Sequence, residues 1–479
     1  MNVDRILISA APGETRIVEL DDGNMVGLTI DRAGQKSLVG DIIAGRVEAV
    51  IHNLQAAFVD IGLERSGYLG LPDARPHGAE GDDGIGDYLS EGDRVLVQVS
   101  RDPQEDKGAK LTMKTVLTGR DLVFTPGRPG ISLSRRISNE EERDRLTSAM
   151  ADFQNADGGY IVRTAAQEAE TEDITGEAAR LQARWVAIDE VFRDAVPPAC
   201  LERELEPACQ LLRDQGGIDL TAIVVDDADV YSRIKAFAEA EMPDIADLVN
   251  MYRGDGPLFD AEGVEEMIDD ALDPWVALPS GGNIRINETD ALIAVDVNTG
   301  GAAGGNREQL MTDVNCEAAA AFAQQIRLRN LSGLMVIDFV TMRREENQQK
   351  VLRALQAALA DDPHRPFMGG FTRFGLVELT RRRKGLSLTE ILCGGPAAPV
   401  KSAMTTALEA LRAVLRAAEI SPGAGIALEL AQAAAGAMKN EVAEAYELTR
   451  ERLGGQLEIH VNASMKPDGF LVLRDGAAT

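Results

Sequence analysis

The sequence predicts a multidomain protein of the mixed α/β class. Its 479 residues are enough for roughly three or more domains at ~150 residues per domain. Between residues 35 and 117, short apolar runs recur at close spacing, with Gly, Asp and Pro between them, which is typical of a small barrel or sandwich. Between residues 291 and 342, two apolar runs flank a segment of helical spacing. The two patterns together favour an α/β fold built from several domains.

The first 34 residues predict a short strand pair, from the runs ILIS, RIVEL and VGLTI and a turn at Asp21-Asp22-Gly23. Two strands do not form a stable unit alone. We therefore expect this segment to belong to a domain that is completed later in the chain.

Residues 35–117 carry the strands of the expected barrel. Their sequences are Ile42-Ile43, GRVEAVI, AAFVDIG, SGYLGL, RVLVQVS and AKLTMK. The acidic, Gly-rich stretch from His77 to Asp87 is expected to be a loop. Phe58 and Tyr68 would be able to stack on nucleic-acid bases if they were exposed, although the spacing alone favours core positions for both.

The rest of the chain predicts alternating helices and strands. Residues 118–204 contain the turn PGRPG, the basic SRRI, the strand GGYIVRT and a charged helix from Glu177 to Arg193. The clearest strand of the next segment is TAIVV. After a linker of Gly and Pro, residues 403–479 predict helix, strand, helix and strand, with LEIHV and FLVL as the last strands.

The charge balance limits the kind of nucleic-acid site that the chain can carry. The net charge is −29, from 49 Lys and Arg against 78 Asp and Glu, which argues against a protein that coats nucleic acid by bulk charge. One local basic track runs from Phe371 to Lys401, and it holds Arg373, Arg381, Arg382, Arg383, Lys384 and Lys401. A nucleic-acid site would therefore have to be focused.

The composition also predicts the compartment. The segment from Met1 to Ala10 contains Asp4 and lacks the long apolar core of a signal peptide. No uncharged apolar run approaches the ~20 residues of a membrane span. The four cysteines are too few and too scattered for a disulfide framework. We expect a reduced, cytoplasmic protein with no membrane span.

Two aspartates follow the apolar runs of the 291–342 segment. ALIAVDVNTG places Asp296 at the end of the first run, and GLMVIDFVTM places Asp338 at the end of the second. The helical spacing between them comes from Leu310, Met311, Val314, Ala318, Ala321, Phe322 and Ile326. A strand–helix–strand unit is usually right-handed with parallel strands, so both aspartates should meet at one carboxyl edge, where open α/β sheets bind ligands.

Two such carboxylates predict a magnesium site. Carboxylates a few Å apart repel unless a cation or proton lies between them. Mg²⁺ takes oxygen ligands from one or two carboxylates, water and substrate phosphate, and it could activate water and stabilise a phosphoryl transition state. Asn298 would point to the same side as Asp296 and could position the water or phosphate. The alternative is that each aspartate is a turn or helix cap, and spacing alone leaves both interpretations open.

The sequence resembles the catalytic half of the ribonuclease E/G family, more closely its ribonuclease G branch, over nearly the whole chain. The block 291–342 is the most specific part of the resemblance. The motifs that carry it are AAFVDIG with SGYLGL, SRRI, GGYIVRT, LPSGGNIRI, ALIAVDVNTG, QQIRLRNLSGLMVIDFVTM and RFGLVELTRRR.

The resemblance implies an architecture. It assigns residues to six segments: 1–34 and 205–275 as the two parts of a ribonuclease-H-like domain, 35–117 as an OB-fold RNA-binding domain, 118–204 as a 5′-sensor domain, 276–392 as a deoxyribonuclease-I-like catalytic domain and 403–479 as a small C-terminal domain.

The resemblance also implies site residues. Asp296 and Asp338 resemble the magnesium ligands, and Asn298 stands beside them in the catalytic site. The 5′-monophosphate pocket would comprise Gly119, Val123, Arg163 and Thr164. Further RNA contacts would come from Phe58, Tyr68, Lys107, Arg135, Arg136 and Arg373. Arg163 suits paired hydrogen bonds to a phosphate and Thr164 adds a hydroxyl donor, whereas Arg163 taken alone would be read as a surface charge.

The sequence departs from the family pattern in two places. The family carries a CxxC-type zinc motif after RFGLVELTRRR, where this chain has ILCGGPAAPVK with Cys393 alone. One cysteine cannot form a tetrathiolate site, even across two chains, so we expect no zinc and no zinc-linked tetramer, whereas a homodimer stays open. The loop TGGAAGGNREQ after Asn298 is bare of aromatic residues and nearly bare of basic ones.

Three functions compete at this stage. The resemblance implies a Mg²⁺-dependent endoribonuclease that cleaves single-stranded RNA in rRNA processing or mRNA decay, favours 5′-monophosphorylated substrates and leaves a 3′-hydroxyl and a 5′-phosphate. The presence of Asp296, Asn298 and Asp338 favours this enzyme, whereas the net charge of −29 and the missing zinc motif favour a family member that binds RNA without cutting it. A metal-dependent phosphatase or DNA nuclease would share the catalytic domain type, and the barrel and 5′ pocket argue against it.

Overall fold

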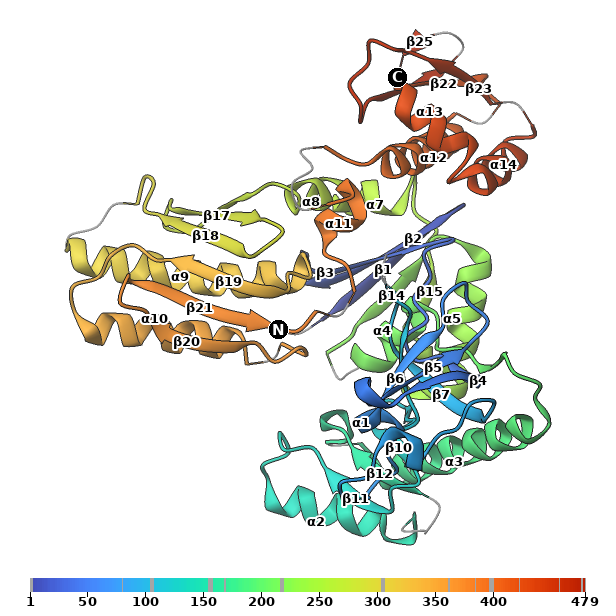
Figure 1. Ribbon diagram of the computed structural model, residues 1–479. Coiled ribbons are helices and arrows are strands. Elements are labelled where there is room, and N and C mark those ends of the chain that lie inside the picture. The colour runs from blue at the N-terminus through green and yellow to red at the C-terminus, as the bar shows by residue number, and fades with distance from the viewer. Residues whose placement is uncertain are drawn as a thin grey trace. The chain divides into compact units, whose positions relative to one another are not determined.

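The structure is a computed structural model, and it forms two compact units (Figure 1). One unit comprises Met1–Gly34, Asp219–Ala236 and Ala246–Thr479, and the other comprises Gln35–Ile218 and Phe237–Ile245. The described residues are 3–79, 81–103, 107–153, 158–167, 169–215, 219–302, 306–360, 362–383, 385–395, 400–421, 423–455, 457–474 and 477–478.

A five-stranded sheet joins the N-terminal segment to a later one. Its strands are β1 (Arg5–Ala11), β2 (Glu14–Asp21), β3 (Asn24–Arg32), β14 (Ala222–Val225) and β15 (Val249–Met251), in the order β15-β14-β1-β2-β3. The segment therefore forms three antiparallel strands rather than a pair. The predicted turn is confirmed at Asp22 and Gly23, which both have positive φ, and β14 pairs with β1 in parallel.

The predicted barrel is confirmed as a closed five-stranded barrel. Its strands are β4 (Ile42–Ile51), β5 (Ala56–Asp60), β6 (Gly67–Gly70), β7 (Arg94–Arg101) and β8 (Lys110–Thr112). They pair in the order β4-β5-β6-β8-β7, and pairing of β4 with β7 closes the barrel. Ile42-Ile43 and GRVEAVI are one continuous strand, β4, rather than two. A further strand, β13 (Ala199–Glu202), pairs with β4 from outside.

A four-stranded sheet follows the barrel in the same unit. Its strands are β9 (Leu117–Thr118), β10 (Leu122–Pro126), β11 (Gly130–Leu133) and β12 (Gly158–Val162), in the order β11-β12-β10-β9, and its helices are α2 (Glu140–Ala149) and α3 (Thr171–Asp194). The predicted charged helix begins earlier than expected, because the acidic first turn of α3 favours a helix N-terminus and outweighs the helix-weakening Gly176.

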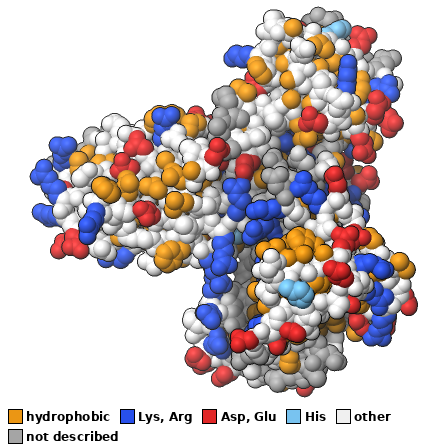
Figure 2. Space-filling view, in the orientation of Figure 1, with side chains coloured by type: hydrophobic (Ala, Val, Ile, Leu, Met, Phe, Trp, Pro, Cys, Tyr) orange, Lys and Arg blue, Asp and Glu red, His pale blue; other side chains and the backbone are white. Residues whose placement is uncertain are grey.

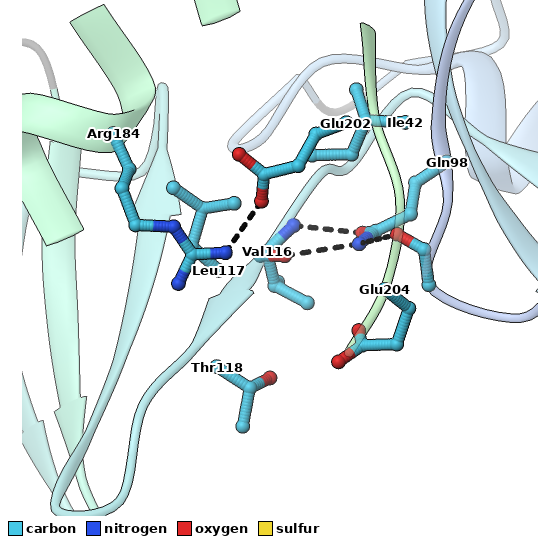
Figure 3. A pocket seen from close by; sticks show the side chains of 9 residues that line it. Ile42, Gln98, Val116, Leu117, Thr118, Arg184, Glu202 and Glu204 are labelled. Atoms are coloured by element: carbon cyan, nitrogen blue, oxygen red, sulfur yellow. Dashed lines mark hydrogen bonds and ion pairs between the residues drawn. The ribbon is translucent and has the colours of Figure 1, made fainter. Parts of the chain in front are cut away.

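A small cavity of about 10 Å³ lies between the barrel and this sheet (Figure 3). The Gln98 side chain spans it, donating to the carbonyls of Gly40 and Val116 at 2.9 and 3.0 Å and accepting from the Val116 amide at 2.9 Å. Arg184 and Glu202 form an ion pair at its wall. A cavity of this size holds at most about one water molecule. It is therefore a small gap in the packing between the barrel and the sheet rather than a ligand site.

A six-stranded sheet contains the segment with the two aspartates. Its strands are β16 (Trp275–Ala277), β17 (Asn283–Glu288), β18 (Ile293–Asn298), β19 (Gly333–Asp338), β21 (Leu376–Arg381) and β20 (Phe367–Phe371), in that order. The two main helices are α9 (Arg307–Leu328) and α10 (Glu345–Ala358). The predicted strand–helix–strand unit is confirmed, and the core between sheet and helices includes Val295, Phe322 and Ile337.

The C-terminal segment forms a smaller αβ layer of helices on a sheet. Its elements are α12 (Ala403–Ile420), β22 (Ile426–Leu430), α13 (Gln432–Lys439), α14 (Ala443–Arg452), β23 (Glu458–Val461), β24 (Phe470–Arg474) and β25 (Ala477–Ala478). Both predicted last strands are present, and three helices replace the two expected. Among the described residues, the other α-helices are α1 (Leu71–Ala74), α4 (Pro207–Gln215), α5 (Ala228–Glu241), α6 (Pro243–Ala246), α7 (Leu258–Ala261), α8 (Val264–Asp270) and α11 (Leu388–Cys393). No helix among the described residues is long and apolar enough to cross a membrane.

A buried ion network ties this layer to the first sheet. The carboxylate of Glu14 accepts from Arg16 at 2.7 Å, from Arg32 at 2.8 Å and from Arg412 of α12 at 3.2 Å. All four side chains are buried. Burial raises the pKa of Glu14, and the three guanidinium groups outweigh that effect and hold the pKa far below its ordinary value.

We expect Glu14→Gln to destabilise the protein by about 3–5 kcal/mol, because removing one partner of a buried ion pair leaves uncompensated charge. Urea unfolding at pH 5.5 measures the effect. Glu19→Gln in the same strand is the matched control, since burial raises the pKa of Glu19 to about 7 and the carboxyl is already neutral at that pH. Equal unfolding midpoints for both variants would contradict the role of Glu14.

Candidate active site

Asp296 and Asp338 lie opposite each other on neighbouring strands. β18 and β19 are parallel, and the register pairs Asp296 with Asp338. Adjacent strands are separated by ~4.8 Å, and directly paired residues point to the same face of a sheet. The two carboxylates therefore share one face at the carboxyl end of both strands.

The alternation of buried and exposed residues along β18 and β19 identifies the face of the sheet on which the two aspartates lie. Val295, Val297 and Ile337 are buried beneath the helices. Asp296 and Asp338 alternate with them and are exposed. The aspartates therefore occupy the open face of the sheet, where water, a metal ion and a polymeric substrate can reach them.

Asn298 extends the site along β18. Its Nδ2 atom donates to Oδ2 of Asp296 at 2.8 Å. This bond orients the Asp296 carboxylate and leaves its second oxygen free of that contact. Asn298 is two residues from Asp296, so both side chains point to the same face of the strand.

The donor set fits a hard divalent cation. Two exposed carboxylates supply oxygen ligands, and Mg²⁺ completes its octahedron with water and substrate phosphate rather than with a full protein cage. The described residues contain no group of three or more His, Cys, Asp and Glu that could hold a metal ion. Asp296 and Asp338 could hold Mg²⁺ as two carboxylate ligands, with the other ligand positions of the ion open to water and substrate.

The alternative that the aspartates are helix caps is wrong. The N-cap of α9 is Asn306, whose side chain accepts from the Glu308 amide at 3.0 Å. The N-cap of α10 is Arg344. Neither Asp296 nor Asp338 caps α9 or α10, and both lie within strands, β18 and β19, rather than in turns.

A second candidate site surrounds Arg163 in the other unit. Arg163 follows β12, and its guanidinium donates to the Gly119 carbonyl at 2.6 Å and to Oδ1 of Asp214 at 2.9 Å. Burial raises the pKa of Asp214, and Arg213 and Arg163 outweigh it, so the pKa lies below its ordinary value. Arg163 is thus a partly buried cation held by an anion rather than an unattached surface charge.

The other predicted pocket residues lie beside Arg163. The Gly119 amide donates to the Leu122 carbonyl at 2.8 Å, and Val123 of β10 pairs with Thr118 of β9. The Thr164 hydroxyl lies 2.9 Å from the Ser134 hydroxyl. The structure therefore brings Gly119, Val123, Arg163 and Thr164 together around the start of the four-stranded sheet.

Two exposed arginines follow Ser134 in the chain. The amide of Arg136 donates to the Ser134 hydroxyl at 3.3 Å, and the side chains of Arg135 and Arg136 are both exposed. The SRRI motif therefore places Ser134 beside Thr164, and two exposed arginines follow Ser134 directly in the chain.

Glu177 is a buried residue of this pocket that the sequence did not single out. Its Oε2 accepts from the Asp121 amide at 2.9 Å, and a Cβ on Gly119 would lie within 1.8 Å of its Oε1. A side chain at position 119 would therefore displace the Glu177 carboxylate from its place beside the Asp121 amide. Burial, with Asp121 nearby, raises the pKa of Glu177 to about 7.

Phe58 and Tyr68, which the sequence spacing predicts to be core residues, are partly exposed on the barrel. Phe58 and Tyr68 are cross-strand partners with ring centroids 6.1 Å apart. Tyr68 is 37% exposed and Phe58 is half-buried, so the core prediction is wrong, because both alternate with residues that fill the barrel interior. Lys107 is exposed, and Lys110, the register partner of Tyr68, is ion-paired with Asp73 at 2.8 Å.

The basic track is less exposed than the sequence suggested. Arg381 is buried, and its Nε donates to Oδ2 of Asp362 at 2.9 Å. Lys401 donates to the Glu409 carboxylate at 2.9 and 3.1 Å, and Lys384 lies outside the described residues. Figure 2 shows that both basic and acidic side chains occur on one face of the molecule. Because Arg381 is buried and Lys401 is ion-paired, the described residues of this track do not form an unbroken row of exposed cations.

Arg373 is an exposed member of that track. It lies in the turn between β20 and β21, where the Leu376 amide donates to the Thr372 hydroxyl at 3.2 Å. Leu376 is the register partner of Asp338. Arg373 therefore sits at the same edge of the sheet as Asp338.

This geometry defines a multidomain α/β protein with a closed barrel and a paired-carboxylate site. A model described as the Ribonuclease E/G family matches residues 116–384. Ribonuclease G of Salmonella typhimurium is 34% identical over 483 residues, which cover 98% of this chain and 99% of that protein. Ribonuclease G of Haemophilus influenzae is 36% identical over 433 residues, 87% of this chain and 88% of that protein. Ribonuclease E of a Nostoc species is 36% identical over 370 residues, 74% of this chain and 54% of that protein. The chain belongs to the ribonuclease E/G family.

The raised pKa of Glu177 predicts a pH-dependent stability. Its folded pKa of about 7 lies above the ordinary value of ~4.3, so its contribution is fully present below pH ~4.3 and is lost as pH rises through about 7. Glu177→Gln should therefore gain stability relative to wild type between pH 5 and 8.5. Thermal unfolding of both proteins at the two pH values measures this gain, and a difference that is independent of pH would contradict the assignment.

Proposed function

We propose that the protein is an endoribonuclease that hydrolyses single-stranded RNA with Mg²⁺ bound by Asp296 and Asp338. The observation that carries the proposal is the register of β18 and β19, which pairs these two carboxylates on the open face. Membership of the ribonuclease E/G family supports RNA as the substrate. We further propose for its domains the six assignments that the resemblance implies, and RNA processing or decay as its role.

The chain's own residues position the reaction. A bound Mg²⁺ would supply an activated water and stabilise negative charge on the phosphoryl group. Asp296 and Asp338 would hold the ion, and the hydrogen bond from Asn298 keeps the Asp296 carboxylate in one orientation. Because β18 and β19 belong to a packed sheet, the carboxylates need little rearrangement before substrate binds. Hydrolysis would leave a 3′-hydroxyl and a 5′-phosphate, as the family resemblance implies.

The pocket around Arg163 would favour RNA with a 5′-monophosphate. Arg163 already holds the Asp214 carboxylate at 2.9 Å, which shows that the guanidinium can bind an oxyanion there. A terminal phosphate would displace the Asp214 carboxylate from the Arg163 guanidinium or bind the guanidinium alongside it. It would also accept a hydrogen bond from the Thr164 hydroxyl. Phe58 and Tyr68 would stack on bases of the same strand, and Lys107 would contact its phosphates.

We expect Asp296→Asn and Asp338→Asn each to abolish Mg²⁺-dependent cleavage, because each substitution removes one of the two charged ligands that would hold and position the ion. Each substitution also relieves repulsion, so thermal stability without metal should hold or rise. A labelled single-stranded RNA incubated with purified protein and Mg²⁺ measures cleavage.

The matched control is Asp290→Asn, an exposed aspartate just before β18, which should cleave at the wild-type rate. Substantial activity in either active-site variant would refute the two-aspartate assignment. Intact RNA with wild type, together with retained binding, would instead identify a protein that binds RNA without cutting it.

We expect wild type to cut 5′-monophosphorylated RNA faster than the same RNA with a 5′-hydroxyl. Loss of a charge-assisted contact costs about 1.5–3 kcal/mol, or about ten- to a hundred-fold in rate. Arg163→Ala should erase the preference and leave the slower cleavage nearly unchanged. Four rates, from two enzymes and two RNA ends, test this. Equal loss of both activities in the variant would exclude Arg163 as an end sensor.

A further inference from the structure

A row of four exposed side chains crosses the open face of the catalytic sheet. Trp275 of β16 is the register partner of Arg285 of β17, Arg285 is the partner of Asp296, and Asp296 is the partner of Asp338. All four side chains are exposed. Directly paired residues on neighbouring strands share a face, so the row leads without interruption from an aromatic ring and a cation to the carboxylate pair.

The burial pattern shows that Trp275 and Arg285 belong to this face and not to the core. Val276, Ile284 and Ile286 alternate with them and pack against the hydrophobic core. Trp275 is 48% exposed. Its ring is therefore accessible at the surface, where an aromatic side chain can stack on a base.

The two side chains are already arranged as a unit. The guanidinium carbon of Arg285 lies 5.2 Å from the centroid of the Trp275 ring, which is a cation–π distance. Among the described residues, no ion pair joins Arg285 to Asp296. The guanidinium therefore contacts the indole ring, and the Asp296 carboxylate remains available to Asn298 and to a metal ion.

The charge of the surroundings indicates what this unit binds. An RNA phosphate that approaches Asp296 and Asp338 meets two negative charges in a chain of net charge −29. The seven residues Thr299–Gly305 that follow Asn298 include no basic or aromatic side chain. Arg285, one strand spacing of ~4.8 Å from Asp296, provides a cation next to the carboxylates, and Trp275 provides the stacking surface.

We propose that Trp275 and Arg285 form a nucleotide-binding subsite beside the aspartate pair. In this subsite the indole stacks on one base of single-stranded RNA and the guanidinium binds a phosphate next to the one that is cut. The inference rests on the proposed function, since it takes the aspartate pair as the site of cleavage. Trp275 and Arg285 position the substrate and take no part in the bond-breaking step.

The protein offers a direct optical test, because it has only two tryptophans, Trp185 and Trp275. Trp185→Phe leaves Trp275 as the sole indole, and adding Asp338→Asn prevents cleavage during the measurement. Titration of this double variant with a short oligoadenylate should quench the Trp275 fluorescence as bases stack on the ring. Unchanged fluorescence at saturating RNA, with binding verified by anisotropy of a labelled oligoadenylate, would overturn the proposal.

Variants of wild type test the contribution to cleavage. Trp275→Ala should raise KM by roughly five- to a hundred-fold, the range for loss of one stacked base, with a smaller change in kcat. Trp275→Phe should restore most of the affinity because it keeps a stacking ring. Arg285→Ala should weaken binding and reduce its salt dependence, whereas Arg285→Lys should retain part of both. Arg353→Ala, an exposed arginine on α10, is the matched control and should behave as wild type.

An abasic nucleotide locates the subsite on the RNA. Placed at successive positions around a single cleavage site, it should slow wild type most at one position within a few nucleotides of the cut, and Trp275→Ala should lose that extra penalty. Equal penalties in both enzymes at every position would overturn the proposal. If wild type does not cleave any RNA but Trp275 is quenched, the subsite stands and the proposed cleavage fails, so the two failures are distinguishable.

Discussion

The parallel pairing of β18 with β19 is the constraint on which the proposed catalytic site depends. Asp296 and Asp338 are 42 residues apart in the chain, and they meet because α9 returns the chain to the same edge of the sheet. The apolar residues that alternate with them bury one face under the helices. A shift of the register by one residue would turn one aspartate into the core, so the packing of the sheet itself determines that the two carboxylates share one face.

Each of the two units contains a buried glutamate that holds neighbouring elements of the fold together. The carboxylate of Glu14 gathers three arginines from β2, β3 and α12, so the C-terminal layer is docked by ion pairs as well as by apolar contact. In the other unit, Glu177 approaches the backbone of Gly119 and Asp121 and shapes the hairpin that holds Arg163. Such groups cost free energy to bury, and they specify one packing in return.

The sequence predicted the elements with strong periodicity and missed what depends on contact between distant segments. The barrel strands, the strand–helix–strand unit and the aspartate pair followed from apolar spacing, because one face of each element is buried. The burial of Arg381 against Asp362 and the exposure of Tyr68 did not, since both depend on which strand lies alongside. Arg285 and Trp275 had no distinctive motif, and only the register of β16, β17 and β18 brings them to the aspartates.

The location of the metal ion tests the central claim most directly. A crystal of the protein soaked with Mn²⁺ in place of Mg²⁺ can be measured at the manganese absorption edge. The account predicts an anomalous peak on the open face of the sheet, ~2.1 Å from carboxylate oxygens of both Asp296 and Asp338, and no such peak in Asp338→Asn. A peak that these carboxylates do not touch, or one that persists unchanged in the variant, would contradict it.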